Sequence, residues 1–181
     1  MSLRLVIAER FLPEAVRNRS LDELADVVAK GFGCRPPQWR GEPFPSRLEE
    51  FARLTATEAA AAHAAGRAAA VKPGLRAGAR RLGADLRRRL GVRTHDEAVR
   101  ALVLLYRQLG IELRIDGTQV EIPRCSFSTA YSPAACEIMS AVDQGLVDGL
   151  TAGWILTFSS RLSAGAPACR AVIAPPREGT A

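Results

Sequence analysis

The stretch IELRIDGTQVEIPRC, residues 111–125, decides the fold. On both sides of its central Asp116-Gly117 pair, apolar residues alternate with polar ones; the apolar positions are Ile111, Leu113, Ile115, Val120 and Ile122. Alternation with a period of two is typical of a strand with one buried face, and Asp-Gly is a favoured hairpin turn. The sequence therefore predicts a β-hairpin that leads directly to Cys125.

The residues after this hairpin predict one more helix and two more strands. Ser132 followed by Pro133 is typical of a helix start, and we expect that helix to run to about Gly149. Residues 153–159 and 168–174 are short apolar segments that favour strands. We expect a mostly antiparallel sheet with this helix packed on it.

The residues before residue 46 predict a helix and an irregular arm. Ser20 and Glu23 have the spacing of a capping box, and apolar residues repeat at helical intervals until Gly31. Residues 33–45 contain four prolines and predict an arm that wraps a neighbour, with apolar anchors at Phe32, Trp39 and Phe44.

Three further helical segments are expected between the arm and the hairpin. Residues 46–70 and 74–90 are rich in helix-forming residues, and Pro73 predicts a break between them. We expect these two segments to form an antiparallel pair. Thr94 and Glu97 have the spacing of a second capping box and predict a helix that ends before the hairpin.

These patterns together predict an α/β fold of the α+β type, with N-terminal helices followed by a mostly antiparallel sheet and one packed helix. We expect residues 1–45 to form the N-terminal helix and Pro-rich arm, and residues 46–174 to form one domain. Within that domain, residues 46–110 are helical and residues 111–174 form the sheet and its helix. Residues 175–181 are expected to be a tail.

Composition narrows the classes of protein. The 181 residues are 48% hydrophobic and 24% charged, and no apolar run is long enough to span a membrane. The N-terminal MSLRLVIAER lacks the apolar stretch of a signal peptide, so we expect a cytoplasmic protein with no membrane contact. Its four cysteines are then expected to be thiols, metal ligands or catalytic groups rather than a disulfide framework.

The net charge of +6 does not by itself predict a polyanion partner. Residues 72–93 contain eight Lys or Arg and one acid, but the arginines lie on several helix faces without interleaved aromatic residues. A solvated helix is the interpretation we adopt, and we do not expect nucleic acid as a partner. A high-GC bacterial genome would give the same arginine bias.

Three of the cysteines are expected to meet. Helical spacing places Cys136, Met139 and Asp143 on one face of the helix predicted after Ser132. Cys125 follows a strand and Cys169 begins another, so both reach this helix if the two strands are neighbours. The sequence therefore predicts one site that contains all three thiols.

A second face of the same helix is expected to pack on the sheet through Ile138, Val142 and Leu146. Gly145 and Gly149 lie one turn apart, and we expect them to let the helix backbone approach that sheet closely.

Several chemistries are open to such a site. Cys125, Cys136 and Cys169 are candidate ligands of zinc, with Glu137 or Asp143 as a fourth ligand, or of an iron–sulfur cluster. Alternatively, one thiolate attacks an electrophilic carbon, and Cys136 in the first turn of its helix is the best placed. Without a metal, no cofactor is needed. The remaining interpretation is that all three are buried residues without chemistry.

Other single residues are expected to lie outside the site. We expect His63 and His95 to have capping or solvent roles, and Tyr131 and Trp154 to belong to the core. Cys34, in the arm, is expected to be incidental.

The segments CSFSTAYSPAACEIMSAVDQGLVDGL (125–150) and ILTFSSRLSAGAPACRAVI (155–173) carry a resemblance. They resemble the L-2-amino-thiazoline-4-carboxylic acid hydrolase-like family and the related 4-vinyl reductase-type small-molecule-binding domain. The likeness covers about residues 94–174. It rests on a cysteine after a strand, a cysteine that opens a helix with a G-x-x-x-G-like end, and a closing G-x-x-x-C, here Cys125, Cys136, Gly145, Gly149, Gly165 and Cys169.

The resemblance implies an α/β sensor-like domain and, for the hydrolase branch, opening of a thiazoline ring on the way to cysteine. The metal-binding sensor branch has a further cysteine where this chain has Arg161, and an acidic residue where it has Ala166. IDGTQVEIPRC and SAGAPACRAVI show a weaker likeness to organomercurial lyase, whose second catalytic cysteine segment has no counterpart here.

We therefore expect a hydrolase-like enzyme that acts on a cysteine-derived or similar heterocycle, at a C=N or C–S bond. Cys125, Cys136 and Cys169 are its expected working groups, with Asp143 or Glu137 assisting. The alternatives are a non-catalytic ligand-binding sensor or accessory module with cysteine-bound metal, and a nucleic-acid-binding regulator. The expected partners are a small-molecule substrate and a second copy in a homodimer.

Overall fold

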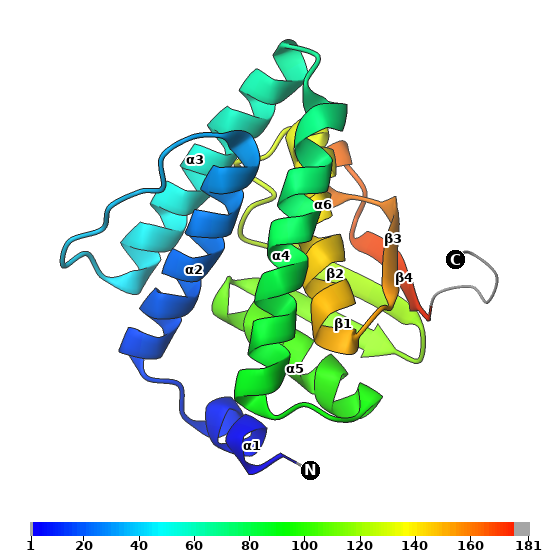
Figure 1. Cartoon of the computed structure of the whole chain (residues 1–181). Coiled ribbons are helices and arrows are strands. Elements are labelled where there is room, and N and C mark those ends of the chain that lie inside the picture. Colours follow the sequence, from blue (N-terminus) through cyan, green and yellow to red (C-terminus); the bar gives the residue numbers. More distant parts are fainter. Residues whose placement is uncertain (1, 176–181) are drawn as a thin grey trace.

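The computed structural model describes residues 2–175 (Figure 1). These residues form six α-helices, a 3-10 helix and four strands. In chain order they are α1 (Leu3–Arg10), α2 (Glu14–Phe32), α3 (Phe44–Ala64), α4 (Ala68–Leu90), α5 (His95–Gln108), β1 (Ile111–Asp116), β2 (Gln119–Cys125), α6 (Pro133–Thr151), β3 (Ile155–Ser160), η1 (Leu162–Ala164) and β4 (Cys169–Ala174).

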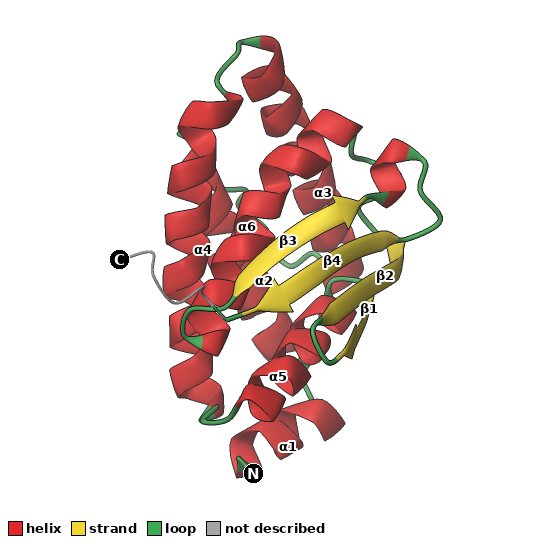
Figure 2. Cartoon of the chain, turned by 90° about the vertical axis from the view of Figure 1, so that its right-hand side faces the viewer, coloured by secondary structure: helices red, strands yellow, loops and turns green. Residues whose placement is uncertain are grey.

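The four strands form one antiparallel sheet in the order β1-β2-β4-β3. The predicted hairpin is present, because Asp116 pairs with Gln119 across the turn. The chain then crosses from β2 through α6 to β3 at the sheet edge and returns as β4 beside β2. Figure 2 shows the sheet on one side of the molecule with the helices behind it. The predicted α+β fold with N-terminal helices is confirmed.

Helix α6 lies at the centre of the molecule and packs most extensively on α4. The predicted role of its glycines was wrong in one respect: they face α4 and not the sheet. A Cβ added at Gly145 would overlap the carbonyl oxygen of Arg76, and one at Gly149 would overlap that of Arg80. The two helix backbones are therefore in direct contact, which only glycine permits here.

The N-terminal helices differ from the prediction. Helix α1 precedes the expected first helix, and α2 begins at Glu14, so Ser20 lies inside it and forms no capping box. Helix α2 also continues past Gly31 and ends at Gly33, whose φ of 76° terminates it. Gly31 instead gives room to the side chain of Leu75 on α4, a contact that local sequence does not reveal.

The predicted break at Pro73 was also wrong. Helix α4 runs through Pro73, and the chain turns at residues 65–67 instead, where Gly66 has a φ of 66°. Pro73 lies in the second turn of α4, where the missing N–H removes a single intrahelical bond. Helices α3 and α4 run in opposite directions, as expected, but they diverge from the turn that joins them, and α4 packs on α6 and α2 instead of on α3 (Figure 1). The predicted capping box of α5 is confirmed, with Thr94 and Glu97 bonded reciprocally.

The Pro-rich arm folds back on its own chain. The Trp39 indole nitrogen donates to a Glu50 carboxylate oxygen at 2.7 Å, and Phe44 is buried under the guanidinium of Arg17. Phe32 is buried in the same core as the sheet and α6. The predicted anchors are therefore part of this chain's core, which continues from the N-terminal helices into the sheet.

A ring stack joins the start of α5 to the segment before β3. The rings of His95 and Trp154 are nearly parallel, with centroids 3.8 Å apart. This contact places His95 outside the cluster of cysteines and holds the end of α6 against α5.

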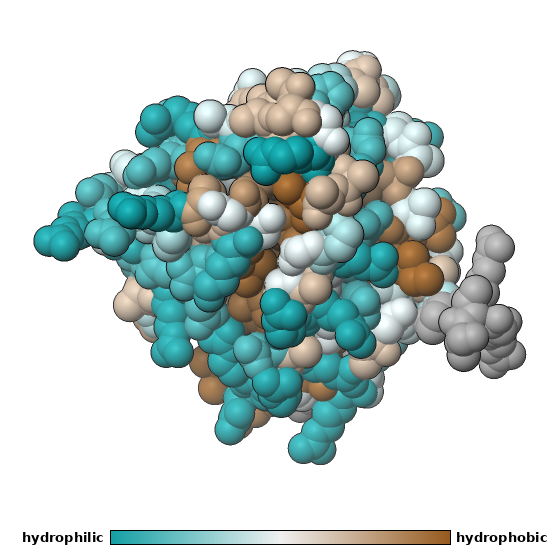
Figure 3. Space-filling model, turned by 45° about the horizontal axis from the view of Figure 1, so that its top comes forward, coloured by the Kyte–Doolittle hydropathy of each residue, from teal (hydrophilic) through white to brown (hydrophobic). Residues whose placement is uncertain are grey.

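Within residues 2–175, no helix is both long and apolar enough to cross a membrane. Figure 3 shows one face of the molecule with mostly hydrophilic residues and smaller hydrophobic areas between them.

Candidate thiol pocket

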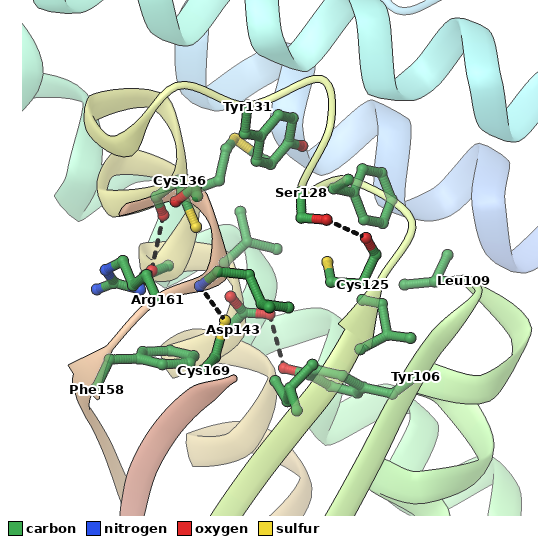
Figure 4. Close-up of a pocket in the computed structure, with 18 of the residues that line it drawn as sticks. Tyr106, Leu109, Cys125, Ser128, Tyr131, Cys136, Asp143, Phe158, Arg161 and Cys169 are labelled. Carbon is green, nitrogen blue, oxygen red and sulfur yellow. Dashed lines mark hydrogen bonds between the residues drawn. The ribbon is translucent and has the colours of Figure 1, made fainter. Parts of the chain in front are cut away.

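A cavity of about 90 Å³ lies between α6, the end of β2, the start of β4 and η1. We call it the thiol pocket. Its walls are mainly apolar, and its chemically distinctive side chains are Tyr106, Cys125, Cys136, Asp143, Arg161 and Cys169 (Figure 4). The space is large enough to hold several water molecules or a small ligand.

Each of the three thiols reaches the thiol pocket from a different element. Cys125 is the last residue of β2, Cys136 lies in the first turn of α6, and Cys169 is the first residue of β4. The strands β2 and β4 are neighbours, with Ile122 opposite Cys169, as the expected convergence requires. All three cysteines and Asp143 line this one cavity.

Burial keeps two of these thiols protonated. It raises the pKa of Cys125 to about 12, and the negative charge of Asp143 adds to the effect. Burial also raises the pKa of Cys169, whose sulfur accepts a hydrogen bond from the backbone N–H of Leu162 at 3.3 Å. Near neutral pH, both groups are therefore neutral thiols.

Asp143 is the ionisable group with the most unusual setting. Burial raises its pKa from 3.8 to about 6, although the Tyr106 hydroxyl donates to its carboxylate at 2.7 Å and Arg161 attracts it. Burial and the nearby Asp143 raise the pKa of Tyr106, so its hydroxyl remains a donor. A carboxyl that exchanges its proton near neutral pH is suited to acid–base chemistry.

Arg161 supplies a fixed positive charge at the thiol pocket. Its Nη1 donates to the Ser140 hydroxyl at 2.6 Å, and its guanidinium lies 4.5 Å from the centre of the Phe158 ring. The Ser140 hydroxyl in turn donates to the carbonyl oxygen of Cys136 at 2.8 Å. Nearby, the hydroxyl of Ser163 is buried without a hydrogen-bond partner in the described structure and lines the pocket.

One candidate from the sequence, Glu137, is not part of this cluster, and Cys34 lies outside it as expected. Glu137 points away from the thiol pocket and forms an ion pair with Lys72 on α4, with an N–O distance of 2.6 Å. Its side chain is 62% exposed, so the structure does not support an assisting role for Glu137. Cys34 lies just beyond the end of α2 and does not line the pocket.

Sequence reasoning missed Tyr106, Ser140 and Ser163, and treated Arg161 only as a departure from a family pattern. Tyr106 lies within the helix predicted after Thr94, but no local pattern links it to Asp143, its partner across the fold. Tyr131 lines the pocket too, with its hydroxyl 2.6 Å from that of Thr55. Its ring is packed with those of the core, as expected.

The residues of the thiol pocket do not fit a metal centre as they stand. Across residues 2–175, no group of three or more His, Cys, Asp or Glu side chains is positioned to hold a metal ion together. Arg161 already brings a positive charge to the pocket, which disfavours a metal ion beside it. Zinc or a cluster stays a prediction, and no chemical step is derived through either.

Part of the basic charge of α4 is used inside the fold. Lys72 pairs with Glu137, Arg80 with Asp148, and Arg89 with Glu23 on α2. These ion pairs link α4 to its neighbouring helices. They also neutralise positive charge that would otherwise be available to bind the phosphates of a nucleic acid.

Comparison of the chain with protein-family models, curated proteins and solved structures finds no match. The resemblance noted in residues 94–174 stays a prediction, and the site is interpreted from its own geometry.

Proposed function

We propose that the protein is a small-molecule hydrolase-like enzyme whose reaction takes place in the thiol pocket. The observation that carries this proposal is Asp143, a largely buried carboxyl whose pKa is raised to about 6, beside three thiols. Burying a carboxylate in a mainly apolar cavity is costly, and enzymes use such settings to match a proton acceptor to neutral pH. The substrate class we propose is a small heterocycle or thioester with an electrophilic C=N or thioester-like carbon.

In the proposed reaction, Asp143 acts as the general base. Its carboxylate takes a proton from water while the resulting hydroxide adds to the electrophilic carbon. The same proton then passes to the departing nitrogen or sulfur, so the carboxylate is regenerated and no proton is gained or lost. The hydrogen bond from Tyr106 fixes the orientation of the carboxylate through both steps.

The thiols divide into two roles in this proposal. Cys125 and Cys169 are neutral and form a polarisable wall around the reacting carbon. Cys136 lies in the first turn of α6, where the helix dipole favours negative charge. It is therefore the thiol we would expect to act as a nucleophile if the reaction passes through a covalent adduct.

A second candidate function is a ligand-binding module without turnover. The observation that favours it is the protonated state of Cys125 and Cys169, which makes two of the three thiols poor nucleophiles. In that case, the thiol pocket would bind the same small molecules and leave them unchanged.

Release of free thiol from small acyl thioesters, and ring opening of 2-thiazoline derivatives followed by mass spectrometry, test the proposal, because a thiazoline ring opened at nitrogen leaves an S-acyl product without a free thiol. We expect Asp143→Asn to lower the rate by about 100-fold or more at pH 7. The wild-type rate should rise with pH around a midpoint near 6, because only the ionised carboxyl is a base. Glu137→Gln, on the outer side of the same helix, should retain the full rate.

The outcomes separate the candidates. Turnover that survives Asp143→Asn would contradict the role of Asp143, and its loss in Cys136→Ser alone would identify a thiolate route. Binding of panel members without product, seen by ligand-detected NMR, would favour the binding module. Neither binding nor turnover across the panel would overturn the proposed substrate class.

A further inference from the structure

The N-terminal helix presents large apolar side chains to solvent. Leu3, Ile7 and Phe11 are 72%, 55% and 70% exposed. In residues 2–175, six large hydrophobic residues are exposed, and these three together with Val16 are four of the six. Single exposed apolar residues need no explanation, but a concentration of this kind at one end of a chain does.

Leu3 and Ile7 are four residues apart and lie along one face of α1, and Phe11 follows directly after its last residue, in extended backbone. We call Leu3, Ile7 and Phe11 the apolar stripe. The opposite face fixes the helix: Leu5 is fully buried, and the carboxylate of Glu9 accepts a hydrogen bond from Arg100 at 2.8 Å. The helix is thus attached to α4 and α5 by its other side, which leaves the stripe without a partner in this fold (Figure 1).

Two arginines border the apolar stripe. At 100° per residue, Arg10 lies on one side of the stripe and Arg4 on the other. Both are exposed, and neither forms an ion pair with a carboxylate in the described part of the chain. The guanidinium of Arg4 bonds only to a carbonyl oxygen, that of Arg89, at 3.4 Å.

The surface beside α1 adds more positive charge. A shallow hollow next to the stripe is lined by Leu3 and Arg4 together with Arg93 and Arg88, of which Arg88 also pairs with Asp85 on its own helix. The carboxylate of Glu97, in the same hollow, is occupied by backbone N–H groups, including that of Arg93 at 2.8 Å. Arginines beside exposed Leu, Ile and Phe give this end of the molecule both the apolar and the basic groups that an anionic lipid surface binds.

We propose that α1 docks the protein on an anionic lipid surface, with the apolar stripe in the headgroup boundary and Arg4 and Arg10 on the lipid phosphates. A second copy of the chain fits this face less well, because a symmetric contact would bring the arginines of both copies together around a small apolar seam. Anionic headgroups supply the opposite charge. Docking of this kind needs no spanning helix, so it is compatible with the lack of one in residues 2–175.

Sedimentation with lipid vesicles tests the docking. Vesicles of phosphatidylcholine alone are compared with vesicles in which roughly a third of the lipid is phosphatidylglycerol. The wild type should bind the anionic vesicles, more weakly as salt rises. Arg4→Ser with Arg10→Ser should lower the partition coefficient roughly 30-fold, and Ile7→Ser with Phe11→Ser at least as much.

The matched control is Ile155→Ser with Val172→Ser, which removes two exposed apolar residues from the sheet and should leave binding unchanged. Thermal unfolding followed by circular dichroism checks that each variant is folded. If the variant with Ile7→Ser and Phe11→Ser does not fold, the variant with Arg4→Ser and Arg10→Ser tests the proposal alone. Equal binding to both vesicle types, no binding at all, or equal loss in the control would overturn the proposal. So would a dimer in light scattering that Ile7→Ser converts to a monomer.

Discussion

The two sides of α6 use opposite means to fix one helix. Toward α4, Gly145 and Gly149 bring backbone against backbone, with no side chain between. Toward the thiol pocket, Cys136, Ser140 and Asp143 project polar side chains into a cavity. Any atom added on the α4 side should lower the free energy of unfolding. On the pocket side, the buried carboxyl of Asp143 itself lowers it. The comparison indicates that close packing against α4 can hold α6 in place although its other face buries a carboxyl that lowers the stability of the fold.

The largest expected effect is on the α4 side. Gly149→Ala would place a Cβ against the carbonyl oxygen of Arg80 and 2.7 Å from the backbone nitrogen of Ala84, so the helices must separate. We expect the free energy of unfolding to fall by about 3 kcal/mol, measured by urea denaturation.

Gly74→Ala is the matched control, because its Cβ would come no closer than 3.7 Å to the backbone of Gly31. It should be neutral or raise the free energy of unfolding by about 0.5 to 1 kcal/mol through helix propensity. Equal stability of the two variants would show that backbone contact does not decide the seating of α6.

An intermediate effect is expected on the pocket side, and it depends on pH. The Asp143 carboxyl has a pKa of about 6 in the folded protein and 3.8 when free, so between these values only the folded state holds the proton. The contribution of Asp143 to stability therefore falls as pH rises from about 4 to 6, by about 3 kcal/mol in total, and is flat above.

Asp143→Asn removes this dependence. The free energy of unfolding of the variant minus that of the wild type should be larger at pH 8 than at pH 4, by up to about 3 kcal/mol. Urea denaturation at both pH values measures it. Parallel pH profiles for the two proteins would mean that Asp143 is not buried as a charged group.

The smallest effect is expected where α6 carries neither feature. Glu137→Gln removes a surface ion pair with Lys72, and surface pairs contribute little. We expect the free energy of unfolding to change by less than about 0.5 kcal/mol. A loss of stability several times larger would show that the ion pair of Glu137 with Lys72 helps to hold α6 against α4.

The parts of the fold that depend on neighbouring residues were predictable from sequence. The hairpin followed from strict alternation around Asp116-Gly117, and the start of α5 from the spacing of Thr94 and Glu97. The positions of Gly31 and Pro73 were misinterpreted, because each looks like a helix terminator when only its own segment is considered. Their roles depend on Leu75 across the interface and on where α4 begins, which are tertiary facts.

The candidate site was partly predictable for the same reason. Helical spacing places Cys136 and Asp143 on one face, and the neighbouring strands deliver Cys125 and Cys169. Glu137 is adjacent to Cys136 in sequence, but 100° of helical rotation turns it toward Lys72. Tyr106 could not be assigned, because its partner Asp143 is 37 residues away and their meeting depends on how α5 and α6 cross.

The stack of His95 on Trp154 gives the molecule an intrinsic optical signal. An indole in contact with imidazole reports on that ring through its fluorescence, and this pair joins α5 to the chain leaving α6. With Trp39→Phe, the remaining Trp154 would be a single, partly buried emitter in the connection between α6 and β3. Its emission could be followed in real time as α6 loosens, without attaching a dye to any cysteine of the pocket.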